Sequence, residues 1–177
     1  SLANFCVRCH ISVGTTIGEP REMPIWDRTP VSREGVTCIT CHRVSEEYTK
    51  ANGERRIEPG KIFDPVYGPT NAEALKDVLA KQDYYHVSLD TTSPGMPIHR
   101  KAIKFEQIGK SEFCVSCHQV AVEPQIKLEV VWEQYRASPA FRKGTTCQDC
   151  HMGIVPGVAS GYATGPAAVI NGEAINP

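Results

Sequence analysis

Four copies of one five-residue pattern occur in the sequence. Each copy has two cysteines separated by two residues and followed directly by a histidine: Cys6–His10, Cys38–His42, Cys114–His118 and Cys147–His151. Two thiols three positions apart on one helical turn can each form a thioether with a haem vinyl group, and the adjacent histidine can ligate the iron. The pattern therefore predicts four covalently attached c-type haems. The predicted attachment residues are Cys6, Cys9, Cys38, Cys41, Cys114, Cys117, Cys147 and Cys150, and the predicted proximal ligands are His10, His42, His118 and His151. The second ring nitrogen of such a histidine usually donates to a backbone carbonyl.

Zinc sites and disulfides are the alternatives for cysteines at this spacing. Paired Cys-x-x-Cys motifs can hold zinc with four thiolates, so four motifs could form two such sites. All eight cysteines belong to the four copies, however, and a histidine follows every copy although the chain has only six histidines. Neither zinc nor a disulfide framework requires that fifth residue. The recurring histidine therefore favours haem.

The second axial ligands are harder to assign. His86 and His99 are the two histidines outside the motifs, and we expect them to be distal ligands of two different haems. Two axial positions then remain, for Met23, Met96, a histidine from outside residues 1–177, or water. Both methionines precede a proline, which more often indicates packing, and Met152 is not expected to bind the iron of its own motif. We expect at least one remaining ligand to come from outside this stretch of chain, from a neighbouring subunit or from further sequence.

Composition indicates how such a chain can fold. Only 41% of the residues are hydrophobic and 7% aromatic, with 14 glycines and 13 prolines. Porphyrins bring large apolar surfaces, so the polypeptide can wrap them with short helices and loops. The predicted fold class is mainly α with much irregular structure, a multihaem cytochrome c wrapped around four covalently bound haems.

Charge and hydropathy limit the possible partners and location. The formal net charge is −1, so no basic surface points to nucleic acid. Haem propionates would make the loaded protein acidic, which favours redox partners with basic docking surfaces. No apolar run approaches the ~20 residues of a membrane span. Haem c is attached outside the cytoplasm, so we expect a periplasmic or extracellular protein whose leader has been removed.

An internal repeat organises the chain. Four residues before the second motif match four before the fourth at one common offset: Pro30, Arg33, Gly35 and Thr37 against Pro139, Arg142, Gly144 and Thr146. We interpret this as a duplicated two-haem module within a single domain, residues 1–177. The parts are a two-haem module 1–48, a connecting segment 49–108, a two-haem module 109–155 and an extended tail 156–177.

Periodicity and turn residues predict several elements. We expect a helix from Asn71, as N-cap, to Lys81, and a second helix over Ile126–Ala137 that ends before Pro139. Lys50–Pro69 is predicted to be a surface loop without chemistry, with a short ribbon at Arg56–Phe63. Gly35 and Gly144 suit turns that lead onto the next haem helix.

The chain resembles multihaem cytochromes c related to the tetrahaem shuttle that collects electrons from hydroxylamine oxidation. The resemblance covers most of the chain and rests on residues 112–118, 132–139 and 146–152. In haem content the chain is similar to tetrahaem subunits of extracellular cytochrome filaments. Members of the shuttle family often carry a distal histidine in the regions that match residues 29–31 or 138–140, where this chain has none. We expect related chains to continue beyond Pro177.

Motifs and resemblance together predict electron transfer through a chain of four haems rather than enzymatic activity. Two alternatives stay open. A five-coordinate haem could act on a small nitrogen or oxygen species, or the chain could be a structural subunit of a filament or larger cytochrome complex. The expected partners are redox proteins and further copies of the chain or other cytochromes that donate axial ligands.

Overall fold

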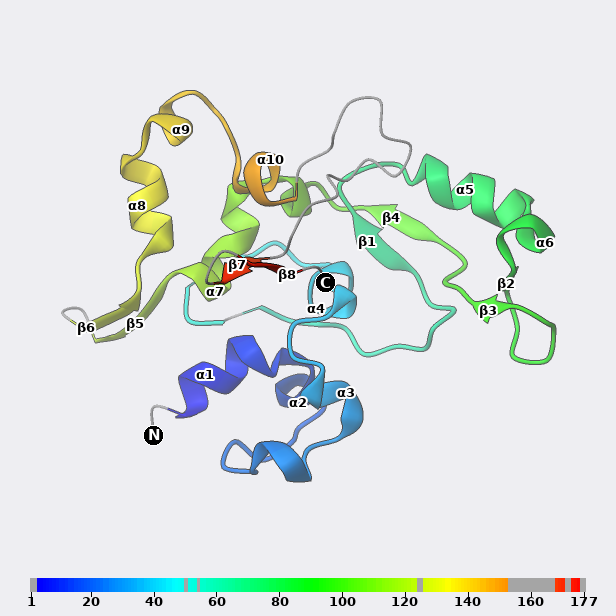
Figure 1. Ribbon diagram of the computed structural model, residues 1–177, viewed down its shortest axis with the longest axis horizontal. Helices are drawn as coiled ribbons and strands as arrows, with labels where there is room; N and C mark the ends of the chain where they lie inside the picture. The colour runs from blue at the N-terminus through cyan, green and yellow to red at the C-terminus, as the bar shows by residue number, and fades with distance from the viewer. Residues whose placement is uncertain are drawn as a thin grey trace.

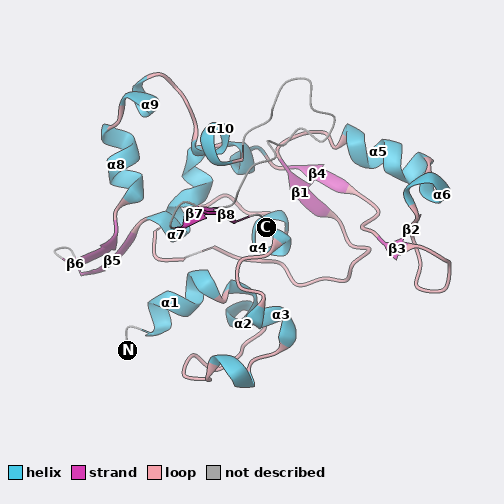
Figure 2. Ribbon diagram, viewed as in Figure 1, coloured by secondary structure: helices cyan, strands magenta, loops and turns pink. Residues whose placement is uncertain are grey.

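The computed structural model describes residues 3–49, 51–53, 55–123, 126–152, 168–170 and 173–175. Short helices joined by loops make up most of this structure, as the fold class predicts (Figure 2). The α-helices are α1 (Ala3–His10), α2 (Ser12–Thr16), α3 (Pro30–Arg33), α4 (Cys38–His42), α5 (Glu73–Ala80), α6 (Gln82–Tyr85), α7 (Val115–His118), α8 (Val131–Ala137), α9 (Pro139–Arg142) and α10 (Cys147–His151). Three 3-10 helices accompany them: η1 (Ile25–Asp27), η2 (Glu106–Gly109) and η3 (Ser111–Cys114). None of the helices in these ranges has the length and apolarity that crossing a membrane requires.

Eight short strands form four two-stranded ribbons within the described ranges. β1 (Val66–Gly68) pairs in parallel with β4 (Ala102–Lys104), and β2 (Val87–Ser88) pairs in parallel with β3 (Met96–Pro97). β5 (Val120–Glu123) and β6 (Ile126–Glu129) are antiparallel, as are β7 (Ala168–Ile170) and β8 (Glu173–Ile175). No larger sheet forms among the described residues, so the ribbons are short local elements in the connections between helices.

The four motif helices are flanked by two arms of the chain (Figure 1). At one end of the long axis α5 and α6 lie beside the β2–β3 ribbon, and at the other end α8 and α9 stand above the β5–β6 ribbon. α4, α7 and α10 lie between these arms, and α1 lies below α7 in the same view. The connecting segment thus forms one arm, and part of the second module forms the other.

A small apolar core joins the halves of the chain. Val44, Ile57 and Phe113 are buried together, and the rings of Tyr48 and Phe113 lie 5.5 Å apart between centroids. Among the residues whose side chains are described, the buried hydrophobic ones are Cys9, Val13, Val44, Ile57, Phe113 and Val115. Such a small core agrees with a chain that folds around cofactors rather than around its own packed interior.

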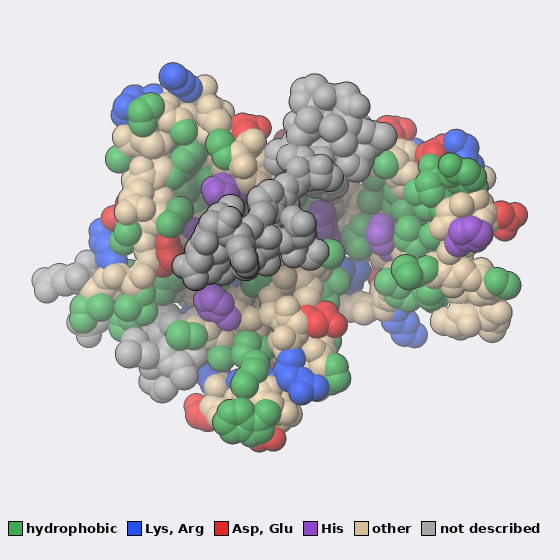
Figure 3. Space-filling view, viewed as in Figure 1, with side chains coloured by type: hydrophobic (Ala, Val, Ile, Leu, Met, Phe, Trp, Pro, Cys, Tyr) green, Lys and Arg blue, Asp and Glu red, His purple; other side chains and the backbone are tan. Residues whose placement is uncertain are grey.

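Large hydrophobic side chains lie on the surface instead. Figure 3 shows them gathered over α5 and α6 at one end of the visible face. Tyr84 in this region is 77% exposed and Met96 of β3 is 74% exposed. Exposed apolar side chains in this number mark surfaces that a cofactor or a partner can cover.

Two helix predictions are confirmed in part. The helix predicted after Asn71 exists as α5, but its N-cap is Ala72, with a left-handed φ of 55° and no side-chain cap, so the assignment of Asn71 as N-cap is wrong. The helix predicted over Ile126–Ala137 begins only at Val131 and ends at Ala137 as expected. Its first residues form β6, because alternating apolar side chains at Ile126 and Leu128 suit pairing with β5.

The connecting segment differs most from the sequence-based expectation. The ribbon predicted at Arg56–Phe63 is absent from the described residues, and the strand lies later, at Val66–Gly68. Backbone carbonyls of this segment accept hydrogen bonds from the buried Arg43 guanidinium instead of pairing with a strand. Of the predicted tail 156–177 the structure describes only β7 and β8; residues 156–167, 171–172 and 176–177 lie outside the described part of the chain, so the tail stays a prediction. Neither the module boundaries nor the duplication is tested by these elements.

Candidate haem-attachment site

Each predicted attachment motif occupies about one turn of helix. α1, α4, α7 and α10 all end at the histidine of their motif. Side chains three positions apart on a helix lie on the same side, so each pair of thiols can reach one porphyrin. This is the arrangement that covalent attachment requires for the eight cysteines and four histidines, and the attachment itself stays a prediction.

The sequence explains where two of these helices begin. Thr37 before α4 and Thr146 before α10 each form a capping box with the residue three positions later. The Asp149 carboxylate accepts from Thr146 N at 2.7 Å, and Thr40 Oγ1 accepts from Thr37 N at 3.2 Å. A capping box satisfies N–H groups that the start of a helix leaves free. It therefore fixes helices that would be too short to be stable alone.

The third motif lies beside the first. Cys9 Sγ is 3.9 Å from the carbonyl oxygen of Ser116 and forms a side-chain hydrogen bond with Cys117. This bond raises the pKa of Cys9 and lowers that of Cys117. The last cysteines of motifs 108 positions apart are therefore neighbours in space.

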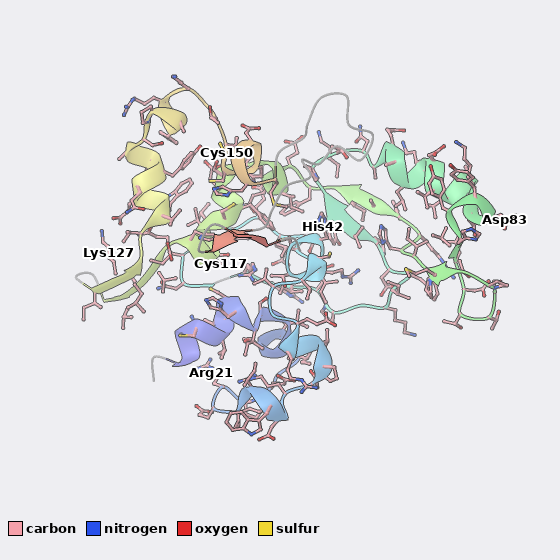
Figure 4. All side chains as sticks on the ribbon, in the orientation of Figure 1. Arg21, His42, Asp83, Cys117, Lys127 and Cys150 are labelled. Atoms are coloured by element: carbon pink, nitrogen blue, oxygen red, sulfur yellow. The ribbon has the colours of Figure 1, made fainter. Side chains whose placement is uncertain are left out.

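The second and fourth motifs also interact with cysteines of the third motif. Burial raises the pKa of Cys114 to about 12, and the neighbouring Cys147 thiol adds to the rise. Burial raises the pKa of Cys41 as well, and Cys41 interacts electrostatically with Cys117. Figure 4 shows Cys117 and Cys150 between the two arms, with His42 further toward the β1–β4 ribbon. The third motif therefore lies beside the first, through the contact of Cys9 with Ser116 O, and beside the fourth, through the hydrogen bond from Cys147 N–H to Ser111 Oγ at 3.0 Å.

His42 is oriented by the backbone of β1. Its Nδ1 lies 2.6 Å from the carbonyl oxygen of Tyr67. A hydrogen bond at Nδ1 holds the imidazole in one orientation and leaves Nε2 available as an iron ligand. This is the contact that we expect of a proximal histidine.

His99 lies near His42. It precedes β4, which pairs with β1 in the same ribbon that orients His42. Burial lowers the pKa of His99, and its electrostatic interaction with His42 lowers it further. The β1–β4 ribbon therefore brings together one predicted proximal ligand and one predicted distal ligand.

The other predicted ligands are more dispersed. His86 caps the C-terminus of α6 in a left-handed conformation, with a φ of 52°, and is exposed. α6 is far from α7 and α10 along the long axis, as the position of Asp83 in Figure 4 shows. His10, His118 and His151 are exposed, Met23 is half-buried and Met96 lies in β3. A role of His86 or of either methionine at an iron stays a prediction.

Sequence reasoning missed a residue in the connecting segment. Arg55 donates from Nη1 to Cys117 Sγ at 3.0 Å and to Ser116 Oγ at 3.2 Å. The segment around it was predicted to be a surface loop without chemistry, and this prediction is wrong, because Arg55 lies against α7 and Ile57 belongs to the core. Charge and glycine content gave no sign of this position.

The described residues fit c-type haem. The chemistry of the donor set is suitable, since every motif supplies two free thiols and one imidazole. Three buried polar atoms near the motifs have no hydrogen-bond partner within the described residues: Arg55 Nη2, Gln119 Oε1 and Gln148 Oε1. Buried polar groups are almost always paired. The Arg55 donor is suited to a haem carboxylate, and the two amide oxygens are suited to accept from bound water.

All eight cysteines and all six histidines lie in the described ranges. Within those ranges no group of three or more His, Cys, Asp or Glu side chains is arranged to hold a metal ion. None of the eight cysteines forms a disulfide.

Comparison with known proteins gives one informative likeness. No protein-family model matches the sequence, and no curated protein does. Among solved structures, a penta-heme cytochrome c552 from Thermochromatium tepidum is similar, with 22% identity and a TM-score of 0.51. The alignment covers 90% of this chain but 42% of that one, so this chain spans less than half of its length. The chain therefore has the fold of a multihaem cytochrome c.

Proposed function

We propose that the chain transfers electrons through four covalently attached haems c in the periplasm or outside the cell. The observation that carries the proposal is the position of the first and fourth motifs beside the third: Cys9 Sγ is 3.9 Å from Ser116 O, and Cys147 N–H donates to Ser111 Oγ in η3, the helix that ends at Cys114. When bound, haem iron supplies one-electron chemistry between its ferric and ferrous states. Groups attached at neighbouring thiols are close to one another, and closely spaced redox centres are suited to a relay.

The chain's own residues hold and orient the cofactors in this proposal. The eight cysteines attach the haems and the four motif histidines bind the irons. His42 and His99 are proposed as the two axial ligands at the second motif, with Tyr67 O orienting His42. A histidine on each side leaves no exchangeable position, which suits a relay rather than a substrate site.

We also propose association with further copies of the chain or with other cytochromes. Apart from His99, His86 is the one histidine of this sequence outside the four motifs. It is exposed on the α5–α6 arm. An exposed imidazole at the end of an arm can reach an iron of a neighbouring subunit. If His86 binds an iron of a neighbouring subunit, the same bond would join subunits into a filament or larger complex, and this structural role is compatible with electron transfer.

The experiment is to express the protein in a host that matures cytochromes c and to measure its mass after denaturation, together with its electron paramagnetic resonance spectrum. We expect the mass of the chain plus four haems, and low-spin signals that cyanide and nitric oxide leave unchanged. A chain with fewer haems would contradict the cofactor count. A dominant high-spin haem that binds either ligand rapidly would favour the enzyme instead.

A further inference from the structure

Two buried arginines have clear structural roles. Arg28 forms an ion pair with Glu19, with 3.0 Å between Nη1 and Oε2. Arg43 donates to the carbonyl oxygens of Glu58 at 3.2 Å and Pro59 at 2.7 Å, and also to that of Pro65. In both cases a buried cation faces a carboxylate or carbonyl oxygens, as the cost of burying charge demands.

A third arginine, Arg55, lacks such partners in the described structure. Its Nη1 contacts a hydroxyl and a sulfur, and sulfur is a weak acceptor. Its Nη2 is buried and has no hydrogen-bond partner among the described residues. A part-buried guanidinium whose buried nitrogen has no acceptor among the described residues is matched best by an anionic oxygen.

The position of Arg55 is fixed by its own segment. The Asn52 backbone N–H donates to Gln119 O at 3.1 Å, and its side chain exchanges two hydrogen bonds with Ala121 at 2.9 and 2.8 Å. The Gly53 backbone N–H donates to Ser116 O. The chain before Arg55 is therefore attached to α7 and the start of β5, which places the Arg55 side chain within reach of Ser116 and Cys117.

Arg55 lies where the first and third predicted motifs meet. Its Nη1 contacts Cys117 of the third motif directly. It also contacts the hydroxyl of Ser116, and the carbonyl oxygen of that residue is 3.9 Å from Cys9 Sγ of the first motif.

We propose that Arg55 Nη2 binds a propionate of a haem attached where the first and third motifs meet, and that it raises the reduction potential there. The inference rests on the proposed four-haem function. A carboxylate supplies the anionic acceptor that Nη2 lacks, and guanidinium–carboxylate pairs are strong. Adding an electron to iron is favoured beside a fixed positive charge, so Arg55 acts as a positioning and potential-setting residue.

The experiment compares Arg55→Gln, Arg55→Lys and the matched control Arg56→Gln. Arg56 is the next residue, but its side chain is 71% exposed and pairs with Glu46 at 3.4 Å. The reduction potentials of each holoprotein are measured by spectroelectrochemical titration. For at least one haem of Arg55→Gln, the ratio of reduced to oxidised haem at the wild-type midpoint potential should be about tenfold lower. This corresponds to a potential that is ~59 mV lower for a one-electron couple. Arg55→Lys should recover most of this shift, and Arg56→Gln should match the wild type.

Four unchanged potentials in Arg55→Gln would overturn the proposal, and so would equal shifts in the glutamine and lysine variants. If Arg55→Gln retains fewer than four haems, its potentials cannot be compared with those of the wild type, and Arg55→Lys is used to test the proposal. The propionate bending bands in its resonance Raman spectrum should then differ from the wild type, because an ammonium replaces a guanidinium, and identical bands would refute the contact. The mass of the wild-type holoprotein tests the four-haem function separately.

Discussion

The segments that enter the second and fourth motifs have the same local structure and different supports. Each begins with a short helix that has proline in its first turn, α3 or α9, and each turns at a glycine with positive φ, 77° at Gly35 and 73° at Gly144. Each then starts the haem helix with a capping box at Thr37 or Thr146. The matching residues therefore produce matching local structure, which is what the proposed duplication requires.

The supports behind these segments differ. In the first half, Glu19 accepts from Arg28 and from both N–H and Oγ1 of Thr29, the residue just before α3. In the second half, the ring of Tyr135 contacts Trp132 and Phe141, and its hydroxyl donates to Thr145 O. A buried ion pair supports one segment and an aromatic cluster supports the other.

The surroundings of the two predicted attachment turns differ as well. α4 is partly buried, Thr40 hydrogen-bonds with Ser12, and His42 Nδ1 contacts Tyr67 O. α10 has no buried residue, and His151 is exposed. The comparison teaches that the matching residues set the local turn, whereas the surrounding residues that do not match set the environment of each motif histidine.

The largest change should come from His99→Ala. We expect one haem, at the second motif, to change from low-spin to high-spin or water-ligated, because its distal imidazole is lost. Electron paramagnetic resonance measures the conversion. Lys101→Ala, two residues away and exposed, is the control and should leave all haems low-spin; an unchanged spectrum in His99→Ala would reject the pairing with His42.

Arg28→Met should destabilise the first half most. The Arg28 and Glu19 side chains are only 2% and 8% exposed, and removing one member of a buried pair leaves the other charge without compensation. Denaturation followed by circular dichroism should give a larger loss of stability than any of the variants below. Arg21→Met, on the exposed neighbour, should have little effect, and similar losses in both variants would argue against the ion pair.

Lowering the pH should weaken the Glu19–Arg28 ion pair and leave the aromatic cluster around Tyr135 unchanged. Burial raises the pKa of Glu19, but hydrogen bonds from Thr29, Ser32 and Arg28 outweigh it and lower the pKa from 4.5 to about 2. Since the folded-state pKa lies below the unfolded one, this contribution is complete above pH 4.5 and is lost as pH falls towards 2. The difference in stability between wild type and Glu19→Gln should therefore shrink over that range; a constant difference would contradict this reading.

Tyr135→Phe should have a moderate effect on the second half. The hydroxyl accepts from Ser111 Oγ and donates to Thr145 O, both at 3.0 Å. Losing these bonds while keeping the ring should cost about 1 kcal/mol of unfolding free energy. Equilibrium denaturation measures it, and Tyr84→Phe, on a 77% exposed ring, is the control that should lose almost nothing.

The two variants Gly35→Ala and Gly144→Ala should differ least from each other in the stability that they lose. Both positions need a left-handed backbone, so each alanine should cost about 1 kcal/mol. An added Cβ meets no atom closer than 3.5 Å at Gly35 and none within 4 Å at Gly144. Equal losses would support equivalent turns, whereas a large inequality in denaturation midpoints would show that the likeness is superficial.

Local features of this protein could be predicted from its sequence, and long-range ones could not. The motif turns, the turn glycines and the end of α8 follow from spacing, proline and glycine chemistry. The position of Arg55 against α7 depends on contacts between residues more than 60 positions apart, which no local pattern contains. The parallel β1–β4 ribbon depends likewise on distant partners, such as Val66 and Ala102. His99 was identifiable as a ligand candidate, but its proximity to His42 comes from that ribbon.

The most direct test of the relay is an anaerobic titration of the purified holoprotein, with the electrons taken up per chain counted while the optical and paramagnetic spectra are recorded. We expect four one-electron reductions per chain, all at low-spin c-type haems that do not bind cyanide. Fewer than four electrons per chain, or reduction dominated by a high-spin haem that binds cyanide, would contradict a four-haem electron-transfer protein.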